Sequence, residues 1–591
     1  MGTKSGSRTV AIGIQDFGSL ISKNCFYVDK TDFIREWWES NDSVTLITRP
    51  RRFGKTLNIS MLEYFFSNRY AGQGALFEGL SIWNDEEYRE LQGTYPVISL
   101  SFASVKEREL QPTKICIYQL ISDLYSQHSY LLQCDALQER DKKNIRNIID
   151  APNEMDDITA TRALHKLSEY LFRYYGKRVI ILLDEYDTPM QEAYVNGFWD
   201  ELVAFTRSMF NSTFKTNPYL ERAMMTGITR VSKESIFSDL NNLKVVTTTS
   251  EEYATAFGFT EAEVFAAMDE MGLSEKEQVK QWYDGFVFGS GRDIYNPWSI
   301  INYLDTGKLA TYWANTSANG LVGKLIREGS SGIKETFESL LAGETITVTL
   351  DEQIVYNQLD DDEDAIWSLL LASGYLKVVE SGEFTQQGEN DWREPECILA
   401  LTNLEVRLMF ENMVRGWFKK ESSCYNDFIK ALLLGDRKAM NAYMNRVALS
   451  TFSYFDTGNR PSGAEPERLP IGKASTSSFK IQNSCACFYH GFVLGLMVDL
   501  RNRYVITSNR ESGFGRYDVM LEPKEKADDA IIIEFKVYDG EDEKNLSDTV
   551  AAALAQIEEK NYAAVLVEKG VPETKIRKYG FAFEGKNVLI G

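Results

Sequence analysis

The sequence predicts an α/β protein that is divided into several domains. Residues 43–102 and 178–230 alternate short apolar runs with helical patterns, and a further α/β pattern begins near residue 488. Runs as apolar as these are typical of parallel strands that are buried on both faces of a sheet. A chain of 591 residues is too long for one hydrophobic core, so we expect about three or four domains.

The composition limits the classes of function. Hydrophobic residues make up 43% of the chain and charged residues 25%, which is typical of a soluble globular protein. No stretch approaches the roughly 18 apolar residues of a membrane-spanning helix, and the N-terminal residues lack the apolar core of a signal peptide. We therefore expect a cytoplasmic protein with no membrane partner.

The net charge of −22 bears on the choice of partners. It argues against broad, non-specific coating of nucleic acid, which depends on many Lys and Arg side chains that contact phosphates. A local basic groove, or a site where bound metal ions offset the charge, is compatible with it.

The first α/β stretch contains the sequence RPRRFGKT, residues 49–56, directly after the strand expected over 44–48. A strand, a turn and a helix that opens on Gly-Lys-Thr form a P-loop, whose helix N-terminus offers unpaired N–H groups to phosphate oxygens. Lys55 is expected to contact the β- and γ-phosphates of ATP, and the Thr56 hydroxyl to bind Mg²⁺. The residues predicted to bind the nucleotide are Arg51, Arg52, Phe53, Gly54, Lys55, Thr56 and Asp184.

This loop departs from the usual P-loop pattern at its start. Arg49 stands where the first glycine normally lies, so the turn forms without its most permissive residue, and Pro50 stiffens it. The side chains of Arg51 and Arg52 either add phosphate contacts or are solvated.

A second apolar run, Val179 to Leu183, ends in Asp184 and Glu185. A buried parallel strand delivers its last residues to the carboxyl edge of the sheet, where ligands bind. Asp184 is expected to hold Mg²⁺, directly or through water, and Glu185 to orient or deprotonate the attacking water. The alternative is a strand end with two solvated acids, but the Gly-Lys-Thr segment upstream favours the catalytic interpretation.

A third polar strand end lies at Thr226 to Arg230. A polar residue there would sense the γ-phosphate, and Arg230 would act as an arginine finger within the chain. An arginine on a surface loop is an equally good interpretation of Arg230.

The C-terminal stretch carries a second constellation, formed by Asp518, Glu534 and Lys536. Alternation along a strand places Glu534 and Lys536 on one face, and Asp518 lies on a preceding strand that can pair beside them. Two carboxylates suit Mg²⁺ or Mn²⁺, which lowers the pKa of a bound water, and Lys536 would position that water. An exposed ion pair between Glu534 and Lys536 is the alternative; Gln556 on the following helix, with Tyr562 after it, favours the metal site.

Residues 10–300 resemble the bacterial AAA-ATPase-like family. The motifs that carry the resemblance are YVDKT at 27–31, RPRRFGKT at 49–56, LLDEYD at 182–187, SKESIFS at 232–238 and WYDGF at 282–286. The resemblance implies a P-loop fold and nucleotide binding, and it makes Arg49 a feature of the family.

Residues 489–581 resemble the PD-(D/E)XK nuclease superfamily. Members of the first family often carry a domain of this superfamily at their C-terminus. The resemblance implies catalytic roles for Asp518, Glu534, Lys536 and Gln556. Many members carry a further acidic residue on the first helix, but residues 484–497 contain none, and Glu511 is the candidate replacement. Nucleic acid would then need a local basic groove. The candidates for such a groove are Arg501, Arg503, Arg510 and Arg516.

These patterns define an expected domain plan. The plan comprises a P-loop domain over 1–245, a helical lid over 246–310, a mostly helical and winged-helix-like middle region over 311–480, and a nuclease-like domain over 481–591.

Two functions stay open. In the first, the protein binds and hydrolyses ATP, and its nucleotide state regulates a Mg²⁺-dependent nuclease acting on DNA or RNA. In the second, a signalling-type ATPase switch carries an inactive nuclease fold that binds nucleic acid or protein. A homo-oligomer is compatible with both by analogy with AAA relatives.

Overall fold

The computed structural model divides the chain into two compact units. The N-terminal unit contains Met1–Val322 and Thr345–Leu408, and the C-terminal unit contains Gly323–Glu344 and Met409–Gly591. The residues described are 8–229, 236–237, 239–313, 322–323, 325–326, 331–350, 363–382, 385–388, 391–393, 396–418, 422–451, 497, 500, 503–512, 515–525, 528–538, 543–584 and 586–591.

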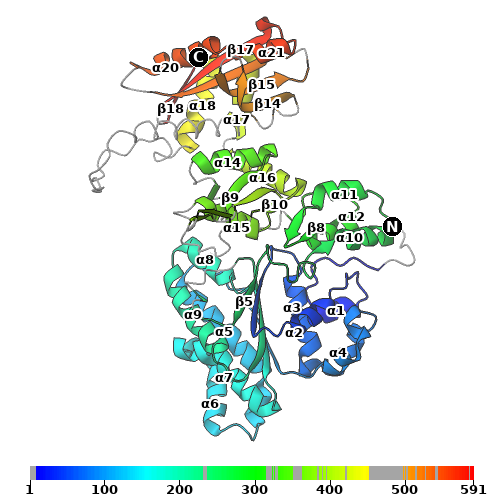
Figure 1. The fold of residues 1–591 in the computed structure, drawn as a ribbon. Helices are drawn as coiled ribbons and strands as arrows, with labels where there is room; N and C mark the ends of the chain where they lie inside the picture. Colours follow the sequence, from blue (N-terminus) through cyan, green and yellow to red (C-terminus); the bar gives the residue numbers. More distant parts are fainter. Residues whose placement is uncertain are drawn as a thin grey trace. The chain divides into compact units, whose positions relative to one another are not determined.

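A parallel sheet forms the centre of the N-terminal unit (Figure 1). Among the described residues its strands follow the order β2-β3-β4-β1-β5, and every neighbouring pair is parallel. All residues of β1 and β3 are buried, as predicted for strands covered on both faces. The strands are β1 (Val44–Thr48), β2 (Val97–Ser101), β3 (Val179–Asp184), β4 (Leu220–Gly227) and β5 (Leu243–Val246). The α/β fold predicted for this part of the chain is confirmed.

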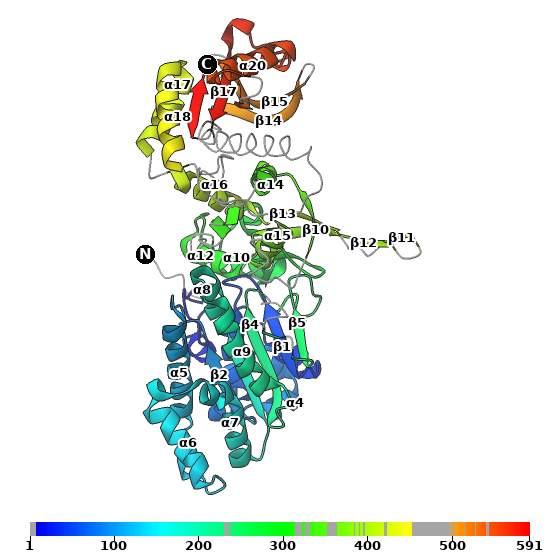
Figure 2. The ribbon, with the colours of Figure 1, turned by 90° about the vertical axis from the view of Figure 1, so that its left-hand side faces the viewer.

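Helices cover both faces of this sheet. One group contains α1 to α4 and the other α5 to α9, and Figure 2 views the second group directly. The helices are α1 (Phe17–Ser22), α2 (Asp32–Glu39), α3 (Lys55–Phe66), α4 (Glu86–Leu91), α5 (Leu110–Gln127), α6 (Glu139–Asp150), α7 (Asp157–Tyr175), α8 (Thr188–Asn196) and α9 (Trp199–Phe214). In the part of the chain that is described, no helix is both long enough and apolar enough to cross a bilayer.

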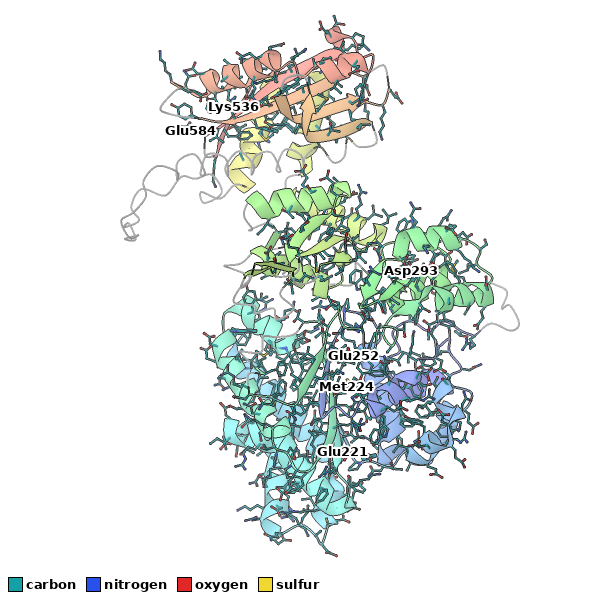
Figure 3. The ribbon with its side chains drawn as sticks, in the orientation of Figure 1. Glu221, Met224, Glu252, Asp293, Lys536 and Glu584 are labelled. Carbon is teal, nitrogen blue, oxygen red and sulfur yellow. The ribbon has the colours of Figure 1, made fainter. Side chains whose placement is uncertain are left out.

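The strand order brings the ends of three strands together. β4 lies between β1 and β3, with Gly227 opposite Thr48 of β1 and Met225 opposite Leu183 of β3. Met224, in the middle of β4, is fully buried (Figure 3). Because parallel strands end at the same edge, the residues that follow β1, β3 and β4 meet at the edge where α/β proteins bind ligands.

The segment expected to form a helical lid is mixed in structure. Its helices are accompanied, among the described residues, by a three-stranded antiparallel sheet in the order β6-β8-β7. The elements are β6 (Phe259–Thr260), α10 (Glu261–Met271), α11 (Lys276–Tyr283), β7 (Phe286–Phe288), β8 (Gly291–Tyr295) and α12 (Pro297–Thr306). The strands span two to five residues, which is too short for a clear alternating pattern in the sequence.

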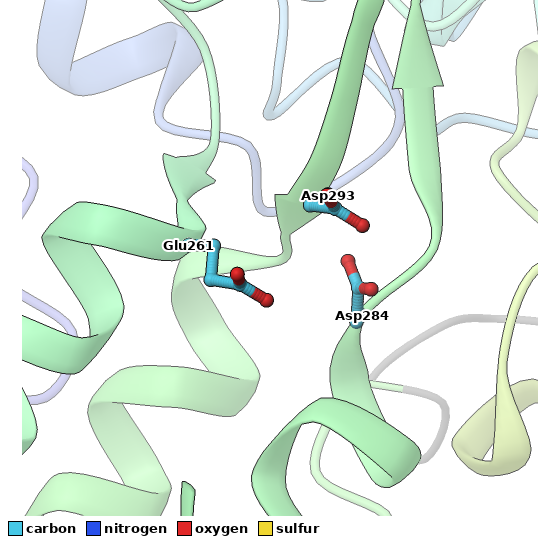
Figure 4. A group of neighbouring side chains, drawn as sticks. All are labelled: Glu261, Asp284 and Asp293. Atoms are coloured by element: carbon cyan, nitrogen blue, oxygen red, sulfur yellow. The ribbon is translucent and has the colours of Figure 1, made fainter. Parts of the chain in front are cut away.

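Three carboxylates of this segment face one another: Glu261 in α10, Asp284 after α11 and Asp293 in β8 (Figure 4). Lys280 lies 2.5 Å from a Glu261 oxygen and 3.9 Å from an Asp293 oxygen, and the Tyr295 hydroxyl donates to Glu261 at 3.4 Å. Burial and the adjacent Asp293 carboxylate raise the pKa of Asp284 to about 6. Lys280 pairs with Glu261, so the uncompensated repulsion falls mainly between the two aspartates.

The two compact units share the region 311–480 between them. The N-terminal unit takes β9 (Ile346–Thr349), α15 (Glu363–Ala372), β10 (Leu376–Ser381), β11 (Thr385–Gly388), β12 (Asp391–Arg393) and β13 (Glu396–Leu401). β10 and β13 pair antiparallel, and β9 joins β13. The boundary between the units falls within α16 (Leu404–Phe418).

The C-terminal unit contains a mixed sheet in the order β14-β15-β16-β17-β18 across its described residues. β16 and β17 are parallel, and the other neighbours are antiparallel. The elements are α14 (Ser331–Ala342), α17 (Ser422–Leu434), α18 (Arg437–Thr451), β14 (Tyr504–Ser512), β15 (Gly515–Pro523), β16 (Ala530–Val537), α20 (Leu546–Glu559), α21 (Ala564–Glu568), β17 (Ile576–Glu584) and β18 (Asn587–Ile590).

The two faces of this sheet pack against different helices. Phe428 and Met444 of α17 and α18 pack with Ile533 on one face, whereas Ile557 of α20 packs with Ile532 on the other. The sequence pattern after residue 488 predicts a helix over 488–500, strands over 504–508, 517–521 and 530–537, and a helix over 546–560. The strands and the second helix correspond to β14 to β16 and α20, whereas α17, α18, β17 and β18 were not predicted. The helix expected over 488–500 lies outside the described residues except for two buried side chains.

We predict that Asp284→Asn stabilises the protein, and that the effect is larger at about pH 7.5 than at about pH 5. The folded-state pKa of about 6 lies above the usual value of 3.8. The folded protein therefore holds this proton more tightly than the unfolded chain, and the stability that it contributes is lost as the pH rises through 6. The asparagine mimics the protonated carboxyl at every pH. Melting temperatures of both proteins at the two pH values measure the effect.

The matched control is Asp305→Asn, because Asp305 is exposed at the end of α12. Its melting temperature should follow that of the wild type at both pH values. An Asp284→Asn effect that is the same at both pH values would contradict the prediction.

Candidate functional site

The turn between β1 and α3 has the backbone shape of an anion-binding loop. Arg52 and Gly54 adopt positive φ angles of 67° and 80°, and α3 begins directly afterwards at Lys55. Residues that alternate between right- and left-handed conformations turn successive N–H groups inward and form a nest for anions. The strand, turn and helix expected over 44–66 are therefore all present.

Asp184 is held at this edge by hydroxyl groups from two other elements. The Thr56 hydroxyl of α3 donates to one carboxylate oxygen at 2.8 Å, and the Thr226 hydroxyl of β4 donates to the other at 2.6 Å. Asp184 is 2% exposed; burial raises its pKa, and the two hydrogen bonds oppose that shift. The carboxylate and the hydroxyl are oxygen donors of the kind that Mg²⁺ prefers, so these residues fit that ion.

Lys55 is buried inside the loop. Its ammonium group donates to the carbonyl oxygens of Arg49 at 2.9 Å and Pro50 at 2.8 Å. Burial lowers the pKa of Lys55, and the nearby carboxylates of Asp187 and Glu185 oppose that shift. The ammonium is therefore held where the loop and the acidic strand end approach each other.

Glu185 follows Asp184 in the turn that leads to α8. It adopts a positive φ of 51° and accepts a hydrogen bond from the Thr188 hydroxyl at 3.2 Å. A non-glycine residue with this backbone conformation is uncommon and marks a tightly constrained turn. Arg230, the candidate arginine finger, lies outside the described residues, so both catalytic roles stay predictions.

The side chains of the three residues before Gly54 point to neighbouring elements. Arg51 donates to the Gln191 side chain at 3.1 Å, and the Arg52 guanidinium lies 4.5 Å from the centre of the Trp298 ring. Phe53 is 1% exposed, and its ring packs against those of Phe286 and Phe288. Contacts of these three residues with a nucleotide stay predictions, and the buried ring of Phe53 leaves only the backbone of that residue available.

Arg49 has a structural environment that the sequence did not reveal. Its guanidinium is fully buried and donates to the Thr48 and Thr247 carbonyl oxygens at 2.9 and 2.6 Å. It also lies 4.6 Å from the centre of the Phe288 ring. Burial lowers the pKa of Arg49 to about 9, so it stays charged at neutral pH and ties the loop to the segment after β5.

Asp187 is a further residue whose role the sequence analysis missed, although it closes the LLDEYD motif. Its carboxylate accepts hydrogen bonds from the N–H groups of Ile228 at 2.8 Å and Thr229 at 3.0 Å. Burial raises its pKa, and the two backbone N–H groups oppose the shift. A Cβ atom on Gly227 would lie 2.9 Å from an Asp187 oxygen, so this turn packs directly on the carboxylate.

The C-terminal constellation assembles on the face of the sheet that α20 covers. Asp518 of β15 lies one position beyond the paired residues Val519 and Ile533, which brings it opposite Glu534 of β16. Its carboxylate accepts a hydrogen bond from the Phe535 N–H at 2.8 Å. Lys536, labelled in Figure 3, is partly buried two residues after Glu534 on the same strand.

Glu534 is the most constrained acid of this constellation. It is 3% exposed, and one carboxylate oxygen accepts a hydrogen bond from Gln556, which also donates to the Tyr562 hydroxyl at 3.1 Å. The other oxygen is buried and has no partner among the described residues. Burial and the Asp518 carboxylate raise the pKa of Glu534 to about 8. A divalent cation would supply the missing partner, so the residues fit a metal site.

The predicted basic groove is described only in part. Arg503 forms an ion pair with Asp528 at 2.5 Å, which offsets its charge. Arg501 and residues 484–496 lie outside the described residues, as do the side chains of Arg510, Glu511 and Arg516.

Comparisons with known proteins find a family match for an N-terminal and for a C-terminal part of the chain. Residues 11–237 match the family described as predicted AAA-ATPase, and residues 487–591 match the PD-(D/E)XK nuclease superfamily. An uncharacterized protein from the vnfD 5′ region of Azotobacter chroococcum mcd 1 is 25% identical over 403 residues, which cover 68% of each chain. The two resemblances stated from the sequence are thereby confirmed: residues 11–237 match the predicted AAA-ATPase family, and residues 487–591 match the PD-(D/E)XK nuclease superfamily.

Proposed function

We propose that the protein binds and hydrolyses ATP with Mg²⁺, and that its nucleotide state regulates a metal-dependent nuclease activity of the C-terminal domain. The main support for ATP binding at this site is that the hydroxyl groups of Thr56 and Thr226 both donate hydrogen bonds to Asp184. These three residues come from a helix and two strands that end beside the loop of Lys55.

Each residue of the N-terminal site has a role in phosphoryl transfer. The loop N–H groups bind phosphate oxygens, and Lys55 exchanges the carbonyl oxygens of Arg49 and Pro50 for the β- and γ-phosphates. Thr56 and Asp184 hold Mg²⁺, which offsets charge on the phosphates. Glu185 accepts the proton of the attacking water.

The C-terminal residues suit hydrolysis of a phosphodiester. Asp518 and Glu534 would hold Mg²⁺ or Mn²⁺, which lowers the pKa of a bound water and offsets charge on the phosphate. Lys536 positions the water or stabilises the developing negative charge. Gln556 fixes the orientation of Glu534 through their hydrogen bond. DNA and RNA are both compatible substrates.

One sequence observation favours a second function. Residues 484–497 contain no acidic side chain, so the metal site would lack a ligand that many members of the superfamily possess. In that case the protein is a signalling-type switch, in which ATP changes the assembly state or exposes a surface. Its C-terminal domain then binds nucleic acid or protein without cutting it.

For the ATP site, we predict that Lys55→Ala loses measurable binding of labelled ATP, because the phosphates lose their central cation. Glu185→Gln should bind ATP like the wild type but hydrolyse it about a hundredfold more slowly, because an amide cannot accept the proton. Equilibrium binding and phosphate release at saturating Mg²⁺ and ATP measure the two effects.

Two exposed residues provide matched controls, Lys215→Ala and Glu201→Gln. Both should bind and hydrolyse ATP like the wild type. Wild-type binding by Lys55→Ala, or wild-type hydrolysis by Glu185→Gln, would remove the respective assignment.

For the C-terminal site, we predict cleavage of DNA or RNA that requires Mg²⁺ or Mn²⁺ and that Asp518→Ala abolishes. The variant loses one metal ligand, and Glu534→Gln should have the same effect because its second oxygen becomes an amide. The assay uses single- and double-stranded substrates, with and without ATP.

Glu573→Ala removes an exposed acid from the same domain and serves as the control. Cleavage that persists in Asp518→Ala would point to a contaminant or to another site. Nucleic acid that binds in an ATP-dependent manner without any product would favour the switch.

A further inference from the structure

We propose that Trp313 and Asn296 are positioning residues of the phosphate loop, which hold its Arg51–Arg52 peptide in the orientation that binds a triphosphate. This inference rests on the proposed ATP binding and extends it. Both residues lie outside the family-matched region, residues 11–237. Neither role was predicted from the sequence.

Two side chains converge on one carbonyl oxygen of the loop. The indole N–H of Trp313 donates to the Arg51 carbonyl oxygen at 3.0 Å, and the side-chain amide of Asn296 donates to the same atom at 3.3 Å. Trp313 is 1% exposed and Asn296 is fully buried. A carbonyl oxygen has two lone pairs and can therefore accept both hydrogen bonds.

The orientation of this carbonyl fixes the neighbouring N–H group. The peptide unit is planar and trans, so the Arg52 N–H points opposite to the Arg51 carbonyl. Arg52 has a φ of 67° and Gly54 has a φ of 80°, which is the alternation that forms an anion nest. Rotating the carbonyl away from its two donors would turn the Arg52 N–H out of the nest.

Both donors are themselves anchored. The side-chain oxygen of Asn296 caps α12 by accepting hydrogen bonds from the N–H groups of Trp298 and Ser299 at 2.9 and 3.3 Å. The backbone N–H of Trp313 donates to Glu405 at 2.7 Å, and the Ser299 hydroxyl donates to the same carboxylate at 2.7 Å. Glu405 therefore links the two donor segments.

Packing also fixes the indole ring. The Trp313 ring lies 5.5 Å from the Phe286 ring and 5.5 Å from the Tyr375 ring, measured between ring centres. Phe286 in turn packs on Phe53 of the loop, 4.8 Å between centres. Trp313→Phe keeps an aromatic ring between Phe286 and Tyr375 and removes the N–H donor, but the smaller ring leaves a cavity that lowers stability.

The experiment compares Trp313→Phe, Asn296→Ser and the double variant in the full-length protein by calorimetric titration with Mg²⁺-ATP. Phenylalanine keeps the ring contacts without the N–H donor, and serine remains a good helix cap without the amide. Each single variant should raise the Kd about fivefold, the effect of one hydrogen bond. The double variant should exceed the product of the single effects, because one remaining donor still holds the carbonyl.

Matched controls are Trp282→Phe and Asn302→Ser, whose side chains form no hydrogen bond with the loop among the described residues. They should bind Mg²⁺-ATP like the wild type. All titrations are made well below the melting temperature of every nucleotide-free variant, so that the Kd reports on the folded loop and not on the stability lost at the buried Trp313.

Three outcomes overturn a claim. Wild-type Kd values in all three variants refute the positioning role while the ATP site stands. Single effects that simply multiply in the double variant also refute it, because the two donors then do not hold the same carbonyl group. A wild-type protein that binds no Mg²⁺-ATP refutes the proposed function itself.

Discussion

The N-terminal site depends on one buried carboxylate, Asp184, and on the two hydroxyl groups that satisfy it. Burying an ionised carboxylate without hydrogen-bond partners would lower the stability of the fold by several kcal/mol. Thr56 and Thr226 remove that cost from two sides. They can do so because β4 lies between β1 and β3, so that the strand carrying Thr226 separates the loop from the strand carrying Asp184. The strand order therefore sets the spacing at which a cation and a phosphate would be bound.

At the position of the usual first glycine, the loop beside Asp184 keeps its shape through buried donors and acceptors. Arg49 stands where the first glycine of a P-loop lies. Its guanidinium donates to the carbonyl oxygens of Thr48, at the end of β1, and Thr247, directly after β5. Lys55 binds two further carbonyls of the same loop. With the Arg51 carbonyl held from outside by Trp313, most of the loop's acceptors are occupied. A rigid loop loses less conformational entropy when a ligand binds, which favours affinity.

The sequence predicted the parts of this arrangement that lie close together in the chain. A buried strand followed by Gly-Lys-Thr, and another followed by two acids, are local patterns whose meaning depends on neighbouring residues. The bonds from Asn296 and Trp313 to Arg51 span 245 and 262 residues, and no periodicity reports them. The lid strands were too short to show alternation, and α17 and α18 lie far in sequence from the sheet they cover. Partners of this kind become visible only once the fold is known.

The two acidic sites solve the same electrostatic problem in different ways. Asp184 has both carboxylate oxygens hydrogen-bonded, so its site is satisfied by the protein alone. Glu534 has one oxygen bonded to Gln556 and one without a partner among the described residues, and its pKa is raised to about 8. With a pKa of about 8, a proton competes with a cation at Glu534 at neutral pH. A cation at Asp184 has in addition to replace two hydroxyl donors, so the two sites differ in the groups that a cation must displace.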